Sequence, residues 1–160
     1  MVGEVDSYDI AVIGAGIAGA SAAWAMAGRH RVVLLEREAQ PGYHTSGRSA
    51  ALFSETYGNA TVRGLSVASR DFLVSPPDGF CEHRLLSPRG VMFVGTEGQE
   101  ALLAGLEEEG ARLVPSVRAI TAAEALARVP ALRRDWVRGA VVEPDAMDID
   151  TNGMLNGFLR

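Results

Sequence analysis

The sequence contains no lysine, and all fifteen of its basic residues are arginines. This absence excludes enzymes that need a lysine amino group, such as pyridoxal-phosphate enzymes with a Schiff-base lysine and P-loop proteins with a phosphate-binding lysine. A lysine general base is excluded for the same reason. The chain must therefore obtain any reactive group from other side chains or from a cofactor.

Cysteine and positive charge are also scarce. A single cysteine, Cys81, rules out a disulfide framework and a thiolate zinc cage, and it fits a reducing compartment. The net charge of −5 has the wrong sign for a protein whose affinity depends on nucleic-acid phosphates. We therefore expect a cytoplasmic protein without a nucleic-acid partner.

The chain also lacks the signature of a signal peptide or a membrane span. Nineteen residues at positions 10–28 carry no charge, but they are mostly alanine and glycine, which gain little on insertion into a bilayer. Acidic residues precede this stretch where a signal peptide has basic ones. We expect no transmembrane segment.

What the chain does have is enough apolar sequence to fold. Hydrophobic residues make up 48% of the 160 residues and charged residues 22%, so intrinsic disorder is excluded. The length allows one domain of ordinary size or part of a larger one.

The strongest motif is a glycine-rich turn between an apolar strand at 8–13 and an alanine-rich helix at 17–27. In this turn Gly14 permits the sharp bend, Gly16 lets a diphosphate approach the backbone, and Gly19 lets the helix pack closely on the sheet. A second apolar strand at 31–35 ends at Glu36, whose carboxylate suits the hydroxyl groups of an adenosine ribose and repels a 2′-phosphate. The pattern predicts an adenine-dinucleotide site, with helix–sheet packing alone as the alternative.

The loop after Glu36 bears on whether the ligand is FAD or NAD. Residues 41–49 are rich in glycine, serine and threonine, and Ser46, Gly47, Arg48 and Ser49 offer N–H groups, hydroxyls and a guanidinium to an anion. A second contact on the phosphate side suits a long, extended ligand such as FAD. A capped surface helix is the alternative explanation of this segment.

These segments resemble a known family. VIGAGIAG, LEREAQPGYHTSGRSAA and TYG are similar to the N-terminal part of FAD-dependent oxidoreductases of the D-amino-acid oxidase/dehydrogenase (glycine oxidase-like) family. GFCEHRLLSPRG, VPALRRD and DIDT resemble the D-arginine dehydrogenase branch in particular. The resemblance implies FAD as cofactor, and oxidation of a D-amino acid or related amine, by hydride transfer to flavin N5, to an imine that water converts to a 2-oxo acid.

The resemblance also assigns site residues. Tyr57 matches an aromatic position near the substrate pocket, and His44 lies where some amine-oxidising flavoproteins attach flavin covalently, although a hydrogen-bonded loop histidine is the plainer interpretation. The residues expected to contact FAD are Gly14, Ala15, Gly16, Ile17, Ala18, Gly19, Glu36, Arg37, His44, Thr45, Ser46, Gly47, Arg48, Ser49, Ala50 and Ala51.

The sequence departs from relatives that act on basic substrates. Those relatives carry polar or acidic groups after GRSAA and after LLSPR, where this chain has Leu52-Phe53 and Gly90-Val91. Such a lining cannot neutralise a guanidinium, so a small or apolar D-amino acid or another amine is the expected substrate.

Neither a metal site nor a hydrolase site is expected. The three histidines are scattered, and no GxSxG motif is present. Asp148 opens a calcium-like loop, but Leu159 occupies the twelfth position, which requires a bidentate glutamate. Asp150 and Thr151 are better explained as a helix cap.

The expected fold is α/β: a partial Rossmann-like FAD-binding βαβ unit followed by the start of an α+β substrate domain. We assign residues 1–75 to the FAD domain, 76–145 to the substrate domain, and 146–160 to a helix that returns to the FAD domain and is cut short.

No further short apolar strand follows the first two, so this strand pair is expected to expose apolar surface on one side. Further strands are expected at 89–95 and 138–143, and further helices at 59–73, 98–109 and 121–129. The inner faces of two of these helices are predicted to be Val62, Leu65, Ser69, Phe72 and Leu73, and Leu102, Leu103 and Leu106, with Gly110 stopping the second helix, while Trp24 and Trp136 are predicted to pack in the core.

Two functions follow from this. The chain is the N-terminal segment of an FAD-dependent oxidoreductase, inactive alone because the residues that hold the substrate carboxylate in the family lie beyond it. Alternatively, it is a non-catalytic FAD- or NAD-binding fragment or subunit that needs a complementing chain.

Overall fold

The computed structural model describes residues 7–160, which divide into two compact units. Unit one comprises residues up to Ala51 together with Val74–Leu85 and Ile149–Arg160. Unit two comprises Leu52–Leu73 and Leu86–Asp148. The chain therefore passes from one unit to the other several times. The domain boundaries that we assigned from the sequence stay a prediction.

Unit one is built on a parallel strand pair. Strand β1 (Ile10–Ile13) pairs with β2 (Val32–Leu35), and helix α1 (Ile17–Ala27) connects them. Parallel neighbours need such a crossover, and branched apolar residues suit strands covered by a helix. The predicted strand–turn–helix–strand order is confirmed. The predicted exposure of apolar surface beside this pair is confirmed as well, because Ile13 is 87% exposed.

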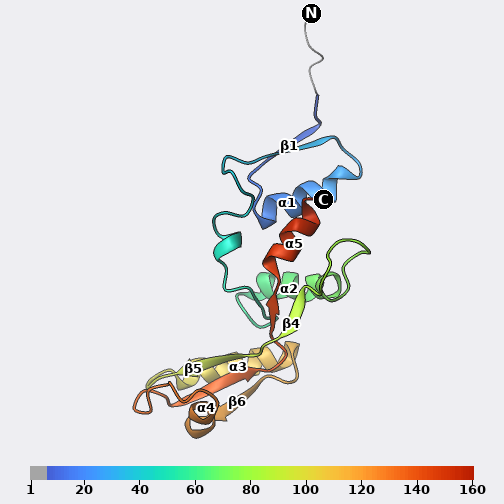
Figure 1. Ribbon diagram of the computed structural model, residues 1–160. Helices are drawn as coiled ribbons and strands as arrows, with labels where there is room; N and C mark the ends of the chain where they lie inside the picture. The colour runs from blue at the N-terminus through green and yellow to red at the C-terminus, as the bar shows by residue number, and fades with distance from the viewer. Residues whose placement is uncertain (1–6) are drawn as a thin grey trace, which may run out of the picture. The chain divides into compact units, whose positions relative to one another are not determined.

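Helix α5 (Thr151–Phe158) lies against α1 in the same unit (Figure 1). The Asp150 carboxylate accepts a hydrogen bond from the N–H of Gly153, which confirms the predicted cap. The rings of Phe158 of α5, Trp24 of α1 and Phe80 make three mutual edge-to-face contacts, with centroids 5.0–5.9 Å apart. This aromatic cluster packs α5 onto the dinucleotide-type unit.

Unit two contains an antiparallel sheet in the order β5 (Val91–Gly95), β7 (Gly139–Glu143), β6 (Arg118–Thr121). Because side chains alternate along β7, Ala140 and Val142 pack on one face with helix α4 (Ala122–Arg128), and Val141 packs on the other beside α3 (Glu100–Leu113). The sheet lies between these helices (Figure 1). The mixed α/β class predicted from the sequence is confirmed.

The sequence did not predict a second sheet. Its strands lie in the order β3 (Leu52–Phe53), β8 (Met147–Ile149), β4 (Leu86–Pro88). Its strands are two or three residues long, too short to show an alternating pattern. Helix α2 (Ala60–Val74) follows β3 and begins at the predicted cap, where Asn59 Oδ1 accepts the N–H of Val62.

Several predicted core positions are wrong. On the helices, Val62 of α2 is 41% exposed, Leu65 of α2 is 64% exposed and Leu102 of α3 is 70% exposed, and Ser69 of α2 is exposed as well. Both predicted core tryptophans are exposed, Trp24 to 41% and Trp136 to 56%. Leu65 and Leu102 carry the right periodicity, but no described segment covers that side of either helix. Trp136 lies instead beneath the guanidinium of Arg133, 4.6 Å from the ring centroid.

The prediction that Gly110 stops α3 is wrong, because Gly110 lies buried inside the helix. A Cβ at this position would come within 2.9 Å of Val117 Cγ1, so glycine serves close packing here rather than helix termination. No helix in the part of the chain that the structure describes has both the length and the apolar character of a membrane span.

Candidate dinucleotide site

The glycine turn between β1 and α1 is shaped by three glycines. Gly14 has φ +97°, a conformation that residues with a Cβ rarely adopt. A Cβ on Gly19 would lie 1.8 Å from the carbonyl oxygen of Gly14, so only glycine allows α1 to begin this close to β1. The N–H of Gly14 also donates to the carbonyl of Leu35, which ties the turn to the end of β2.

The N-terminus of α1 points its N–H groups at the loop that contains Ser46. Gly16 is the N-cap and supplies no side chain, while Ser46 Oγ accepts the N–H of Ile17 at 3.0 Å. A Cβ on Gly16 would approach Ser46 Oγ to 3.2 Å. The first turn of a helix carries partial positive charge and unpaired N–H groups, which suits a diphosphate.

Glu36 lies beside this turn at the end of β2. Its carboxylate accepts the N–H of Ala15 at 2.8 Å, that of Arg37 at 2.7 Å and that of Glu38 at 3.0 Å. These backbone donors, that of Glu38 first, lower the pKa of Glu36 below its ordinary value of 4.5. A charged acceptor is therefore held at the place where the fingerprint expects a ribose.

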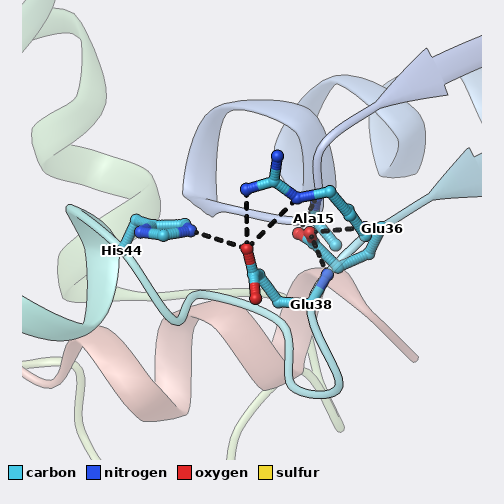
Figure 2. A network of polar contacts seen from close by, with 5 residues as sticks. Ala15, Glu36, Glu38 and His44 are labelled. Carbon is cyan, nitrogen blue, oxygen red and sulfur yellow. Dashed lines mark hydrogen bonds and ion pairs between the residues drawn. The ribbon is translucent and has the colours of Figure 1, made fainter.

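Glu38 is the centre of a second polar contact set (Figure 2). One oxygen, Oε1, accepts from the Arg37 guanidinium at 2.8 Å and lies 3.0 Å from Nε2 of His44. The Arg37 contact, followed by the His44 contact, lowers the pKa of Glu38. These interactions give His44 a hydrogen-bonding partner within its own loop, and its role toward the flavin stays a prediction.

The loop from residue 40 to residue 51 folds back under the glycine turn. Gly42 donates to the carbonyl of Ala15, and Gly47 donates to the carbonyl of Gly42. Ser46–Arg48 form a single 3₁₀ turn. The guanidinium of Arg48 lies over the ring of Tyr43, 5.0 Å from its centroid, so it is anchored within the loop.

The end of this loop contains a strained residue. Ala51 has φ +54°, and among residues 7–160 it is the only non-glycine residue with a positive φ. A left-handed alanine costs about 1–2 kcal/mol, and such strain is concentrated at functional sites. A cavity of about 360 Å³ adjoins the same loop, with Tyr43, Ser46, Arg48 and Leu155 among its lining residues.

These observations fit an FAD diphosphate and adenosine. The turn closes only with glycine, the helix N-terminus faces it, and a carboxylate stands at the ribose position. Hydrogen bonds bring Gly14–Gly19, Glu36 and Ser46 together, and Glu38 joins Arg37 to His44. Of the remaining predicted cofactor residues, Thr45, Gly47, Ser49, Ala50 and Ala51 lie along the same loop.

Tyr57, the predicted substrate-side residue, belongs to unit two. Its side chain is 64% exposed, directly after three buried residues, Ser54–Thr56. Sequence reasoning missed the residue that holds these three, Glu143. The signal was present in the strand pattern, because Glu143 shares the face of Val141 and so places a carboxylate on a core-facing position.

Residues 9–160 match the family described as FAD dependent oxidoreductase. The chain belongs to this family. FAD, the cofactor predicted from the sequence, is the cofactor of the family, and that prediction is confirmed at this level.

Solved structures share the fold. Glycine oxidase from Geobacillus kaustophilus is 22% identical with a TM-score of 0.77, and the match covers 94% of this chain and 43% of that chain. L-alpha-glycerophosphate oxidase from Mycoplasma pneumoniae, solved with FAD bound, is 13% identical with a TM-score of 0.79, and the match covers 96% and 42%. NikD, an amino acid oxidase of nikkomycin biosynthesis, is 26% identical with a TM-score of 0.74, and the match covers 96% and 40%. The chain thus spans about two-fifths of the length of these relatives.

Proposed function

We propose that this chain binds FAD through unit one and supplies the dinucleotide-binding part of an enzyme that oxidises a D-amino acid or a related small amine. The observation that carries the proposal is the glycine turn itself. Its sharp bend, the helix N-terminus that follows it and the Glu36 carboxylate are arranged as a diphosphate and a ribose require.

Each residue has a stated task in this proposal. The first turn of α1 and the Ser46 hydroxyl bind the diphosphate, and Glu36 accepts hydrogen bonds from the ribose hydroxyls. The same carboxylate repels a 2′-phosphate, so NADP is a poor ligand. When bound, FAD supplies the hydride acceptor at flavin N5. The substrate would give up a hydride to that acceptor and a proton to solvent and so become an imine, which water would hydrolyse to a 2-oxo acid and ammonia.

The proposed substrate is small or apolar. Among the solved structures with this fold are a glycine oxidase, a proline dehydrogenase and an L-amino acid deaminase, so amino acids are a shared substrate class of these neighbours. In this chain Val91 follows Gly90 where relatives that act on basic substrates carry polar or acidic groups. An unpaired guanidinium beside such residues would lose its hydration without gaining a partner. We therefore propose an amino acid with a small or apolar side chain as the preferred substrate. The resemblance to D-amino-acid oxidases and dehydrogenases is the ground for proposing its D enantiomer, and the single cysteine is the ground for proposing a cytoplasmic location.

The second candidate is a non-catalytic dinucleotide-binding chain that needs a complementing chain. The observation favouring it is that the predicted cofactor residues, positions 14–51, all lie in unit one, whereas the predicted substrate-side residue Tyr57 lies in unit two. The two candidates share the FAD site and differ in whether substrate reduces the flavin.

The test is to incubate the purified protein with FAD, both alone and beside a complementing chain that carries the substrate-carboxylate residues, remove free ligand, and record the flavin absorption band before and after adding D-alanine. A retained band that bleaches supports the oxidoreductase. A retained band that does not bleach supports the non-catalytic candidate. If no flavin is retained, FAD binding is wrong for both candidates, and binding of NADH in its place would leave only the NAD-binding form of the second candidate.

Gly16→Val identifies the site in the same experiment. A Cβ on Gly16 would already lie 3.2 Å from Ser46 Oγ, and the larger valine side chain would block the approach of the diphosphate. We expect retention of FAD to be lost. Gly105→Val is the matched control, because Gly105 has open space around a Cβ and lies in α3, outside unit one. Unchanged FAD affinity in Gly16→Val would refute the assignment.

A further inference from the structure

The side chain of Glu143 is the most deeply buried carboxylate among the described residues, with 2% exposure. It stands at the end of β7 on the same face as Val141, which packs in an apolar cluster beside α3. An apolar residue would be the ordinary choice at this position, because a buried carboxylate is costly unless all its oxygens are hydrogen-bonded.

The hydrogen bonds of the Glu143 carboxylate go to one short loop. Oε2 accepts the hydroxyl of Ser54 at 2.7 Å and that of Thr56 at 2.5 Å, and Oε1 accepts the backbone N–H of Glu55 at 3.1 Å. The three loop residues are themselves 3–8% exposed. The carboxylate therefore fixes both the backbone and two side chains of a segment that lies 87–89 residues away in sequence.

The same loop is held from its other side. The Arg70 guanidinium of α2 pairs with the Glu55 carboxylate at 2.5 Å, and Arg63 Nε donates to the carbonyl of Gly58 at 2.9 Å. Tyr57 lies between these fixed points. Its ring is nonetheless 64% exposed, so the immobilised loop presents an aromatic side chain without burying it.

We propose that Glu143 is a positioning residue, which fixes the loop 54–56 so that Tyr57 is presented to the amine substrate. This rests on the proposed function, in which Tyr57 lies on the substrate side. A network of satisfied buried hydrogen bonds selects one conformation, whereas an apolar residue would hold the loop only by contact. Displacement of a substrate-contacting group by about 1 Å can lower a rate by about 100-fold.

The test compares Glu143→Leu with Glu143→Gln in the FAD-loaded protein labelled with 3-fluorotyrosine. The chain has three tyrosines, and Tyr57→Phe assigns the ¹⁹F resonance of Tyr57. In Glu143→Leu we expect this resonance to shift and broaden while those of Tyr8 and Tyr43 stay unchanged. Anaerobic flavin reduction by D-alanine, measured beside the complementing chain, should slow by about 10- to 100-fold. Glu143→Gln should keep most of the wild-type Tyr57 resonance and most of the wild-type rate of flavin reduction, because its amide can still bond the hydroxyls of Ser54 and Thr56 and the Glu55 N–H.

Two controls separate positioning from general stability. Val141→Ala weakens the packing of the same strand on the same face, and it keeps every hydrogen bond that the Glu143 carboxylate accepts from the loop. This variant should leave the Tyr57 resonance unchanged. In a Tyr57→Ala background, Glu143→Leu should slow flavin reduction no further, because its effect passes through Tyr57.

The outcomes distinguish this inference from the proposed function. An unchanged Tyr57 resonance in Glu143→Leu overturns the inference. The inference is also overturned if the Tyr57 resonance moves in Glu143→Leu while flavin reduction keeps its rate. It is overturned as well if Val141→Ala shifts the Tyr57 resonance as much as Glu143→Leu does. If the wild-type flavin is not reduced at all, the oxidoreductase proposal fails, and with it the substrate-presenting role of Tyr57, whereas the resonance alone still shows whether Glu143 fixes the loop.

Discussion

At the scale of single residues, the dinucleotide site depends on groups whose chemical type matters more than their size. The Glu36 carboxylate is the proposed acceptor for the ribose hydroxyls, and it already accepts hydrogen bonds from three backbone N–H groups. Hydrogen bonds to an ionised acceptor are stronger than neutral ones. Glu36 should therefore contribute to folding as well as to binding.

Replacing Glu36 by glutamine tests this contribution through its pH dependence. The folded-state pKa of Glu36 is lowered, so its stabilising effect is present above the ordinary value of 4.5 and is lost as the pH falls through the lower folded-state value. We expect the wild type to unfold at higher urea concentration than Glu36→Gln at neutral pH. The gap between the two midpoints should shrink as the pH is lowered below 4.5. A gap that is the same at both pH values would contradict the assigned charge effect.

At the scale of elements, local signals in the sequence predicted helix starts better than helix ends. The capping box at Thr121 is present: Thr121 Oγ1 accepts the N–H of Glu124, and the Glu124 carboxylate accepts the N–H of Thr121. The donors on Thr121 lower the pKa of Glu124. By contrast, Gly110 has the local character of a helix stop, and only its surroundings show that it serves packing.

Two glycines of α3 provide a matched pair for this point. Gly105 has open space around a Cβ, so Gly105→Ala should stabilise the protein by about 0.5–1 kcal/mol through helix propensity. Gly110→Ala gains the same propensity but places a Cβ 2.9 Å from Val117 Cγ1 and should destabilise by about 1–3 kcal/mol. The measurement is the free energy of unfolding in urea. Equal shifts in the same direction would show that the packing of Gly110 is unimportant.

At the scale of the whole molecule, the chain consists of two units that alternate along the sequence. The predicted FAD ligands Gly14–Ala51 all lie in unit one, whereas Tyr57 and Glu143 lie in unit two. A ligand that binds only the folded unit one should raise its stability by mass action. At 100 times its dissociation constant the gain is about 2.7 kcal/mol.

Thermal unfolding with and without FAD measures this gain. We expect FAD to raise the midpoint of the transition of wild-type protein and of Gly105→Val, and to leave Gly16→Val unchanged. NADP should have no effect, because the Glu36 carboxylate repels its 2′-phosphate. A rise of equal size in Gly16→Val would place the ligand away from the glycine turn.

The sequence by itself determined the βαβ order, the glycine turn, the acid after β2 and the helix caps, because each of these follows from short-range geometry within a few residues. It also indicated the family, through the resemblance of several segments along the chain. Only the tertiary structure decided which apolar faces are covered, that Gly110 lies inside a helix, and that Glu143 holds the loop before Tyr57. These depend on contacts between residues far apart in the chain, such as Ser54 and Glu143, and no local pattern encodes which distant partner a buried group will meet.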